Sequence, residues 1–202
     1  ASDAFAGNAE KGKPAMVVSA LISKSPTMIY FGQELGEPAL EDLGFGDPTR
    51  TSIFDYGSVP SVVRWVNDKN FDGGKSTSEE LALRDFYKRL LNFSLENSAI
   101  MGAYADIHWH NRQHTEWYND RVHSFVRWSE TDKLIIVTNF DAKDTFGFEL
   151  QLPQDIIQQW KLNDGTYKAI DQLYGEEEAR LTIEEQSGRM RVDIKPLQSF
   201  VF

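Results

Sequence analysis

The stretch Thr27 to Glu34, with the sequence TMIYFGQE, constrains the fold of this chain most. Four large apolar residues stand in a row between Pro26 and Gly32. Because successive side chains of a strand point to opposite faces, a strand here is apolar on both, as in parallel sheets covered by helices. The polar residues Gln33 and Glu34 follow at its carboxyl end, the end that carries the active site in α/β barrels. The stretch therefore predicts one βα unit of a barrel.

Helical patterns flank this stretch. The run from Pro14 to Ser23 is apolar on most sides, which predicts a buried helix, and Pro14 suits its first turn. The hydroxyl residues before Glu79 and Glu80 predict a capped helix start, and leucines and aromatics recur at helical spacing up to about Leu95. A helix is therefore expected from Ser78 to Leu95. Residues 35–75 are expected to form a long irregular loop that is ordered by its aromatic side chains.

From residue 103 onward, short strand-like runs recur with turn residues between them, a spacing typical of an antiparallel β-sandwich. Ser187 and Gly188 are the predicted turn of one hairpin. The fold class that follows is α+β, with the last βα unit of a (β/α)8 barrel in residues 1–101 and an all-β sandwich domain in residues 102–202. The predicted strands are Arg121 to Trp128, Lys133 to Phe140, Phe146 to Leu152, Tyr167 to Leu173, Arg180 to Glu185, Met190 to Ile194 and Ser199 to Phe202.

The composition excludes several classes of function. A formal net charge of -10 without a basic cluster argues against a nucleic-acid partner. There is no cysteine, hence no disulfide and no zinc–thiolate site, and no apolar run of the roughly 18 residues that a membrane helix needs. This chain shows no signal peptide, and its start at Ala1 is expected to result from design or from cleavage. The compartment stays open, with a secreted or periplasmic parent among the alternatives.

An ordered set of motifs resembles the α-amylase superfamily, glycoside hydrolase family thirteen. PTMIYFGQE looks like its last barrel strand, and RTSIFDY (50–56), VVRWVN (62–67) and LRDFYKRLLNFSLENSAIMGAY (83–104) follow in the family's order. The C-terminal hundred residues are similar to the β-sandwich that closes such enzymes. The resemblance implies a parent that acts on α-glucans such as starch and maltooligosaccharides, as a retaining glycosidase with two catalytic carboxylates.

The same resemblance implies that the catalytic groups lie outside this chain. It places the nucleophile and the acid after the fourth and fifth barrel strands, and a His-Asp pair after the seventh, just before Ala1. Asp3 has no histidine before it and receives no catalytic role. No catalytic residue and no cofactor are therefore predicted, and the α-glucan is a partner of the parent. The alternative is a stand-alone module that binds carbohydrate or self-associates, because the uncovered apolar strand can recruit another copy.

Seven residues are candidates for contacting the α-glucan. Those before residue 60 lie at the predicted strand end and on the loop after it, where the competing interpretation is a packing or surface role. Those after residue 100 offer flat aromatic faces for sugar rings, and packing in the sandwich is again the alternative. The candidates are Gln33, Glu34, Arg50, Tyr56, Trp109, Trp117 and Tyr118.

The histidines His108, His110 and His114 form a cluster in the sequence. If the first two shared one face of a strand, a metal could be held by three imidazole nitrogens once a turn brought the third close. A stray pair at a strand edge is the favoured interpretation, so no metal site is predicted.

Overall fold

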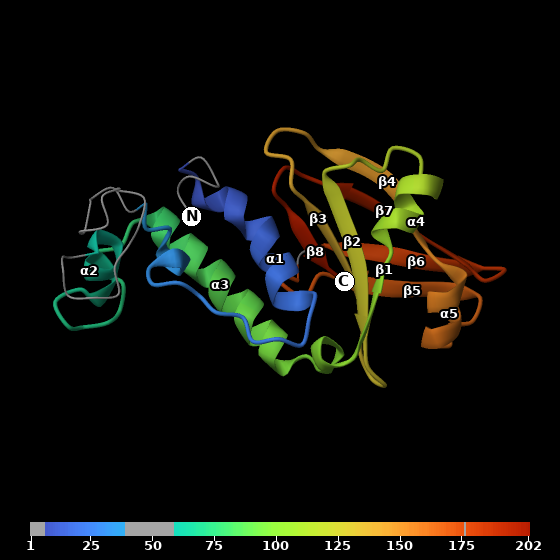
Figure 1. Cartoon of the computed structure of the whole chain (residues 1–202), viewed down its shortest axis with the longest axis horizontal. Helices are drawn as coiled ribbons and strands as arrows, with labels where there is room; N and C mark the ends of the chain where they lie inside the picture. The colour runs from blue at the N-terminus through green and yellow to red at the C-terminus, as the bar shows by residue number, and fades with distance from the viewer. Residues whose placement is uncertain (1–6, 39–58, 176) are drawn as a thin grey trace. The chain divides into compact units, whose positions relative to one another are not determined.

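The computed structural model describes residues 7–38, 59–175 and 177–202 (Figure 1). The chain divides into two compact units, residues 1–12 with 26–91 and residues 13–25 with 92–202. The division at residue 101 that the sequence suggests stays a prediction. The helices are η1 Ala9–Gly12, α1 Lys13–Leu21, η2 Gln33–Leu35, α2 Pro60–Val66, α3 Ser78–Glu96, η3 Ser98–Met101, α4 His108–His114 and α5 Gln154–Trp160. The strands are β1 Ala103–Asp106, β2 Val122–Trp128, β3 Lys133–Asn139, β4 Phe146–Leu152, β5 Gly165–Ile170, β6 Glu178–Glu184, β7 Ser187–Ile194 and β8 Ser199–Val201.

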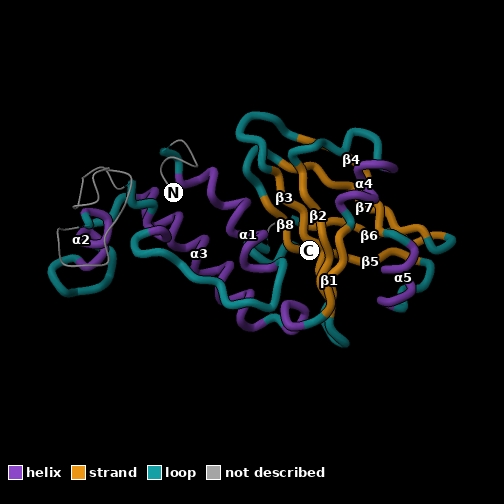
Figure 2. Tube along the Cα trace, in the orientation of Figure 1, coloured by secondary structure: helices purple, strands orange, loops and turns teal. Residues whose placement is uncertain are grey.

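Two four-stranded antiparallel sheets make up the sandwich of the second unit (Figure 2). Their strand orders are β1-β2-β3-β8 and β4-β7-β6-β5. Apolar and polar residues alternate along β7, and this alternation fixes which face of the strand points into the core. Met190, Val192 and Ile194 are buried, while the residues between them are exposed. Side chains from both sheets meet in one apolar core. The sandwich and all seven strands predicted in it are confirmed.

Four elements of this unit were missed by sequence reasoning: η3, β1, α4 and α5. The sequence of α4, HWHNRQH, has no apolar stripe, and α5 spans only seven residues, so neither shows a helical period. Tertiary packing decides both cases. Ile156, Ile157 and Trp160 of α5 are buried in the sandwich core, which holds this short helix in place.

The predicted turn at Ser187 and Gly188 is wrong by two residues. Glu184 pairs with Ser187, so the hairpin turns at Glu185 and Gln186, whose φ angles of 49° and 63° are left-handed. Gly188 lies in β7 instead, where a Cβ atom would come within 2.8 Å of the Leu152 side chain. The glycine therefore serves close packing between strands, which a turn-residue pattern cannot distinguish from a turn.

The predicted start of the long helix α3 is confirmed in the first unit. The Thr77 Oγ1 atom accepts a hydrogen bond from the Glu80 backbone N–H (3.2 Å), and a Glu80 carboxylate oxygen accepts one from the Thr77 N–H (2.9 Å). This reciprocal pair is a capping box. Arg64 of α2, a helix inside the segment expected to be irregular, donates from Nε to the same carboxylate at 3.1 Å. Its hydrogen bond is the main cause that lowers the pKa of Glu80.

The strand predicted from Thr27 to Phe31 is wrong for this structure. The segment has no regular secondary structure, and no described strand pairs with it. A strand exists only through hydrogen bonds to a neighbour, so the apolar pattern alone could not make one. Met28 is 86% exposed, and Tyr30 and Phe31 are also exposed. These exposed apolar side chains keep self-association open as a prediction.

Candidate functional site

Gln33 and Glu34 lie on η2, and the side chain of Gln33 fastens this turn to helix α3. Its Nε2 donates to the Tyr87 hydroxyl at 3.0 Å, and its Oε1 accepts from the backbone N–H of Tyr30 at 3.1 Å. Burial raises the pKa of Tyr87, and the charge of the half-buried Glu34 raises it further. The amide of Gln33 is thus engaged within the protein. Two other candidates, Arg50 and Tyr56, lie outside the described residues.

Trp109 and Trp117 both expose their rings, at 66% and 76% of their surface. The backbone N–H of Trp109 donates to the Asp106 carboxylate at 3.1 Å, which places this residue in the first turn of α4. Trp117 follows α4 in a turn, where its φ angle of 68° is left-handed. A bulky residue in that conformation carries a backbone strain that the surrounding turn must offset. These two rings are the described candidates that a flat ligand can reach.

Tyr118 stands beside Trp117 in the sequence but lies in the core, at 7% exposure. Its hydroxyl is hydrogen-bonded to the Ser124 hydroxyl (2.9 Å) and to the Nδ1 atom of His108 (3.1 Å). Its ring packs edge-on against Phe148, with the ring centres 5.0 Å apart. Burial raises the pKa of Tyr118. A buried ring offers no face to a sugar, so the stacking role considered for Tyr118 does not fit this structure.

The histidines of the sequence cluster lie on helix α4, not on a strand. One turn apart, His110 and His114 place their ring centres 4.8 Å from each other. His108 instead lies next to His123 of β2, with 5.3 Å between the ring centres. The three-nitrogen arrangement is therefore not formed. Within the described ranges, no group of three or more His, Cys, Asp or Glu side chains is suited to a metal ion.

The half-buried histidine pair His108 and His123 predicts how stability depends on pH. Burial is the main cause that lowers the pKa of both His108 and His123. The unfolded chain takes up these protons near the ordinary value of about 6.5, before the folded protein does. The stability that depends on the two neutral imidazoles is therefore complete above about pH 6.5. The free energy of unfolding falls as the pH drops below that value.

We expect His123→Gln to reduce this fall, measured as the difference between urea-unfolding free energies at pH 7.5 and pH 5.5. The substitution removes one imidazole whose protonation is disfavoured in the folded state. Gln113→Ala, at an exposed position of α4 that carries no titratable group, is the control and should keep the wild-type difference. An equal fall in all three proteins would show that the pair makes no contribution.

Comparisons with known proteins connect this architecture to one group of enzymes. No family model and no curated protein matches the chain. Solved structures do match. An α-amylase from Geobacillus thermoleovorans complexed with acarbose superposes with a TM-score of 0.58 over 96% of this chain, at 14% identity. AmyP in complex with maltose gives 0.55 over 96% at 17% identity, and an α-amylase from H. orenii gives 0.53 over 99% at 16% identity.

This chain has the fold of one part of an α-amylase-type enzyme. It spans only 33%, 34% and 36% of the length of those three proteins, in the same order. At such low identity the matches establish the fold. They confirm the resemblance predicted from the motifs, and the partial coverage is consistent with a C-terminal region. In the part of the chain that the structure describes, no helix is long and apolar enough to cross a membrane.

Proposed function

We propose that this chain is the non-catalytic C-terminal region of an enzyme that acts on α-glucans. The observation that supports it most is the match itself: nearly the whole chain superposes on about a third of several α-amylase-type structures. One of those proteins was crystallised with maltose and another with acarbose. In this proposal the sandwich completes the parent enzyme, and the catalytic carboxylates lie on barrel strands that precede this chain.

The environment of the buried carboxylates supports a structural role. Asp171 accepts hydrogen bonds from the backbone N–H groups of Val201 and Tyr174, both at 3.0 Å. Asp141 accepts from the backbone of Lys143 and Asp144, and these bonds lower its pKa. A general acid for glycoside cleavage needs the opposite, a raised pKa. Buried carboxylates that are tied to the backbone in this way hold local structure.

The test is incubation of the chain with maltoheptaose, followed by chromatography of the sugars. We expect no more of any shorter oligosaccharide than in a control without protein. A retaining glycosidase needs two carboxyl groups about 5–5.5 Å apart across the glycosidic bond, and in this proposal that pair lies outside the chain. Product that grows with protein concentration and disappears when one carboxylate of this chain is replaced by its amide would refute the proposal.

A second candidate function is binding of glucan by the sandwich unit, and the exposure of Trp109 and Trp117 favours it. Stacking on a sugar ring requires an open aromatic face, which both indoles offer.

If this function is present, starch cast into a native gel should retard the wild-type chain, and Trp109→Ala or Trp117→Ala should lose retardation. Phe71→Ala, at an exposed aromatic residue of the other unit, is the control and should keep it. Retardation that is unchanged in both tryptophan variants would exclude these rings as the binding surface.

A further inference from the structure

Two histidine side chains lie next to each other on the outer side of helix α4. His110 is half-buried and His114 is exposed. Residues four apart in a helix are neighbours on the same face, and the centres of these two imidazole rings are 4.8 Å apart. Imidazole nitrogen is a preferred ligand of Zn²⁺, Cu²⁺ and Ni²⁺. The pair therefore offers two ligands that could bind one metal ion.

The distance between the two rings matches the geometry of a shared metal ion. An ion about 2.0–2.1 Å from a ring nitrogen lies about 3.2 Å from the centre of that ring. Two rings on one ion then have their centres about 4.5 Å apart when the ligands meet at a right angle, and about 5.2 Å apart at the tetrahedral angle. The observed 4.8 Å lies between these two values. Both rings can thus reach one ion while the helix stays in place.

Gln151 of β4 holds this turn of the helix. Its backbone pairs with the amide of Asn111, which accepts from the Gln151 N–H at 2.8 Å and donates to the Gln151 carbonyl at 2.9 Å. The Gln151 Nε2 atom donates to the His114 carbonyl at 2.7 Å, and the same side chain is hydrogen-bonded to the His110 ring. A metal-bound imidazole commonly has such a partner on its other nitrogen, which orients the ring. The site is therefore anchored before any ion binds.

The protonation of His110 favours a metal ion over a proton. Burial lowers the pKa of His110, and the neighbouring His114 lowers it further, against the opposing effects of Gln151 and Asp155. The ring is therefore mostly neutral at pH 7.5, and neutral imidazole is the form that binds a metal. The formal net charge of -10 also favours a cationic ligand.

The second histidine pair, His108 and His123, is a poorer candidate although its ring centres are 5.3 Å apart. The Nδ1 atom of His108 is hydrogen-bonded to the Tyr118 hydroxyl at 3.1 Å, and the ring is also hydrogen-bonded to the backbone of Val122. A metal ion would have to displace these bonds. This pair therefore serves as an internal comparison for the pair on the outer side of α4.

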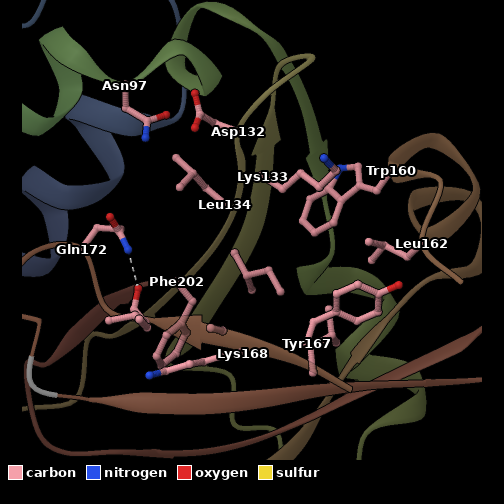
Figure 3. A pocket seen from close by; sticks show the side chains of 14 residues that line it. Asn97, Asp132, Lys133, Leu134, Trp160, Leu162, Tyr167, Lys168, Gln172 and Phe202 are labelled. Carbon is pink, nitrogen blue, oxygen red and sulfur yellow. Dashed lines mark hydrogen bonds between the residues drawn. The ribbon is translucent and has the colours of Figure 1, made fainter. Parts of the chain in front are cut away.

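A cavity of about 360 Å³ among β3, β5 and Trp160 of α5 does not suit a metal ion (Figure 3). No histidine lines it, and its one carboxylate, Asp132, stands against two lysines, Lys133 and Lys168. The Asp132 carboxylate already accepts hydrogen bonds from neighbouring hydroxyls. The pair on α4 is therefore the better candidate for a cation.

We propose that His110 and His114 bind one late first-row transition-metal ion, with water completing its coordination. Cu²⁺ should bind more tightly than Zn²⁺, as the general order of affinities for nitrogen ligands requires. Among the described residues no group of three or more His, Cys, Asp or Glu side chains is suited to a metal. The ion would therefore keep positions open to water, unlike the ion of a closed four-ligand site. This site is independent of the α-glucan proposal.

The experiment titrates the 202-residue chain with ZnCl₂ at pH 7.5 and follows the ring C–H resonances of its four histidines by NMR. Single His→Gln variants assign the resonances. We expect the resonances of His110 and His114 to shift together, with one dissociation constant on the order of 0.1 mM, because only two protein ligands are present. CuCl₂, measured by calorimetry, should bind roughly tenfold more tightly or better.

His114→Gln should weaken Zn²⁺ binding roughly tenfold or more, because a single imidazole is left, and its exposed position makes the substitution compatible with the fold. His123→Gln is the control and should bind like the wild type. Binding should also weaken at pH 5.5, where protons compete for the nitrogens.

Three results would overturn the proposal. One is a Zn²⁺ shift at only one of the two histidines, and another is wild-type affinity in His114→Gln. The third is equal binding of MgCl₂, an ion that prefers oxygen ligands, because it would assign the effect to carboxylates.

Discussion

Replacing Arg127 by methionine should lower the free energy of unfolding by about 3–5 kcal/mol. This arginine of β2 is only 2% exposed. Its guanidinium donates to the backbone carbonyls of Ile22 at 3.0 Å, Ala99 at 3.3 Å and Gly102 at 3.4 Å, and also to that of Ile100. It therefore joins the end of α1 and the end of η3 to the sheet.

The expected loss of stability is large because a methionine side chain fills part of the volume of the arginine but donates no hydrogen bond. The Ala99 carbonyl keeps a second donor, the backbone N–H of Gly102 at 3.0 Å, whereas among the described residues no other donor is seen for the Ile22 and Ile100 carbonyls. A buried acceptor without a partner costs about 1–3 kcal/mol. Urea unfolding is the measurement, and Arg189→Met on the exposed side of β7 is the control, expected within about 0.5 kcal/mol of the wild type. A loss at Arg127 no larger than at Arg189 would contradict the role given to the guanidinium.

Asn111→Asp is expected to cost a similar amount, about 3–5 kcal/mol at neutral pH. Asn111 of α4 is fully buried, and its amide pairs with β4 as a neighbouring strand would. Its Oδ1 accepts from the Gln151 N–H at 2.8 Å, and its Nδ2 donates to the Gln151 carbonyl at 2.9 Å. The same Nδ2 donates to the Ile107 carbonyl at 2.9 Å. A carboxylate would turn an oxygen toward these two carbonyls.

The pH dependence of this variant separates lost hydrogen bonds from lost packing, because aspartate has nearly the shape of asparagine. The new carboxyl should have a raised pKa, since burial and the two carbonyl oxygens disfavour its charge. As the pH falls through that pKa, the carboxyl becomes a donor again, and the deficit relative to the wild type should shrink. Asn163→Asp, in an exposed loop, should show neither the deficit nor its recovery. A deficit that stays constant with pH would point to packing.

The fold was predictable where the sequence carries a local period. The alternation in β7 and the capped start of α3 depend on residues close together in the chain, and both are present. The apolar stretch at Thr27 to Phe31 shows the limit, because a strand depends on a neighbour that no local pattern supplies. The structural roles of Arg127 and Asn111 could not be predicted from the sequence either. Their partners lie far away in the sequence, and isolated polar residues resemble surface positions.

The candidate site was predictable only in part for a related reason. The sequence offers Trp109, Trp117 and Tyr118 as equivalent aromatics, but the Tyr118 hydroxyl is hydrogen-bonded inside the protein to His108 and Ser124. Gln33 was a candidate for contacting the glucan, with a packing or surface role as the alternative, and its amide is engaged by Tyr87 and by the backbone of Tyr30. The cavity beside Trp160 left no trace in the sequence, because its walls come together only when the sheets pack.

The most direct measurement of the central claim is covalent trapping. A retaining α-glucosidase forms a glycosyl ester on its carboxylate nucleophile, and a fluorinated α-glucosyl fluoride makes that ester long-lived enough for mass spectrometry. The chain, incubated with this reagent beside an active α-amylase as a positive control, should keep its unmodified mass. A stoichiometric adduct on an aspartate or glutamate of this chain, absent after denaturation, would contradict the claim that the catalytic carboxylates lie outside it.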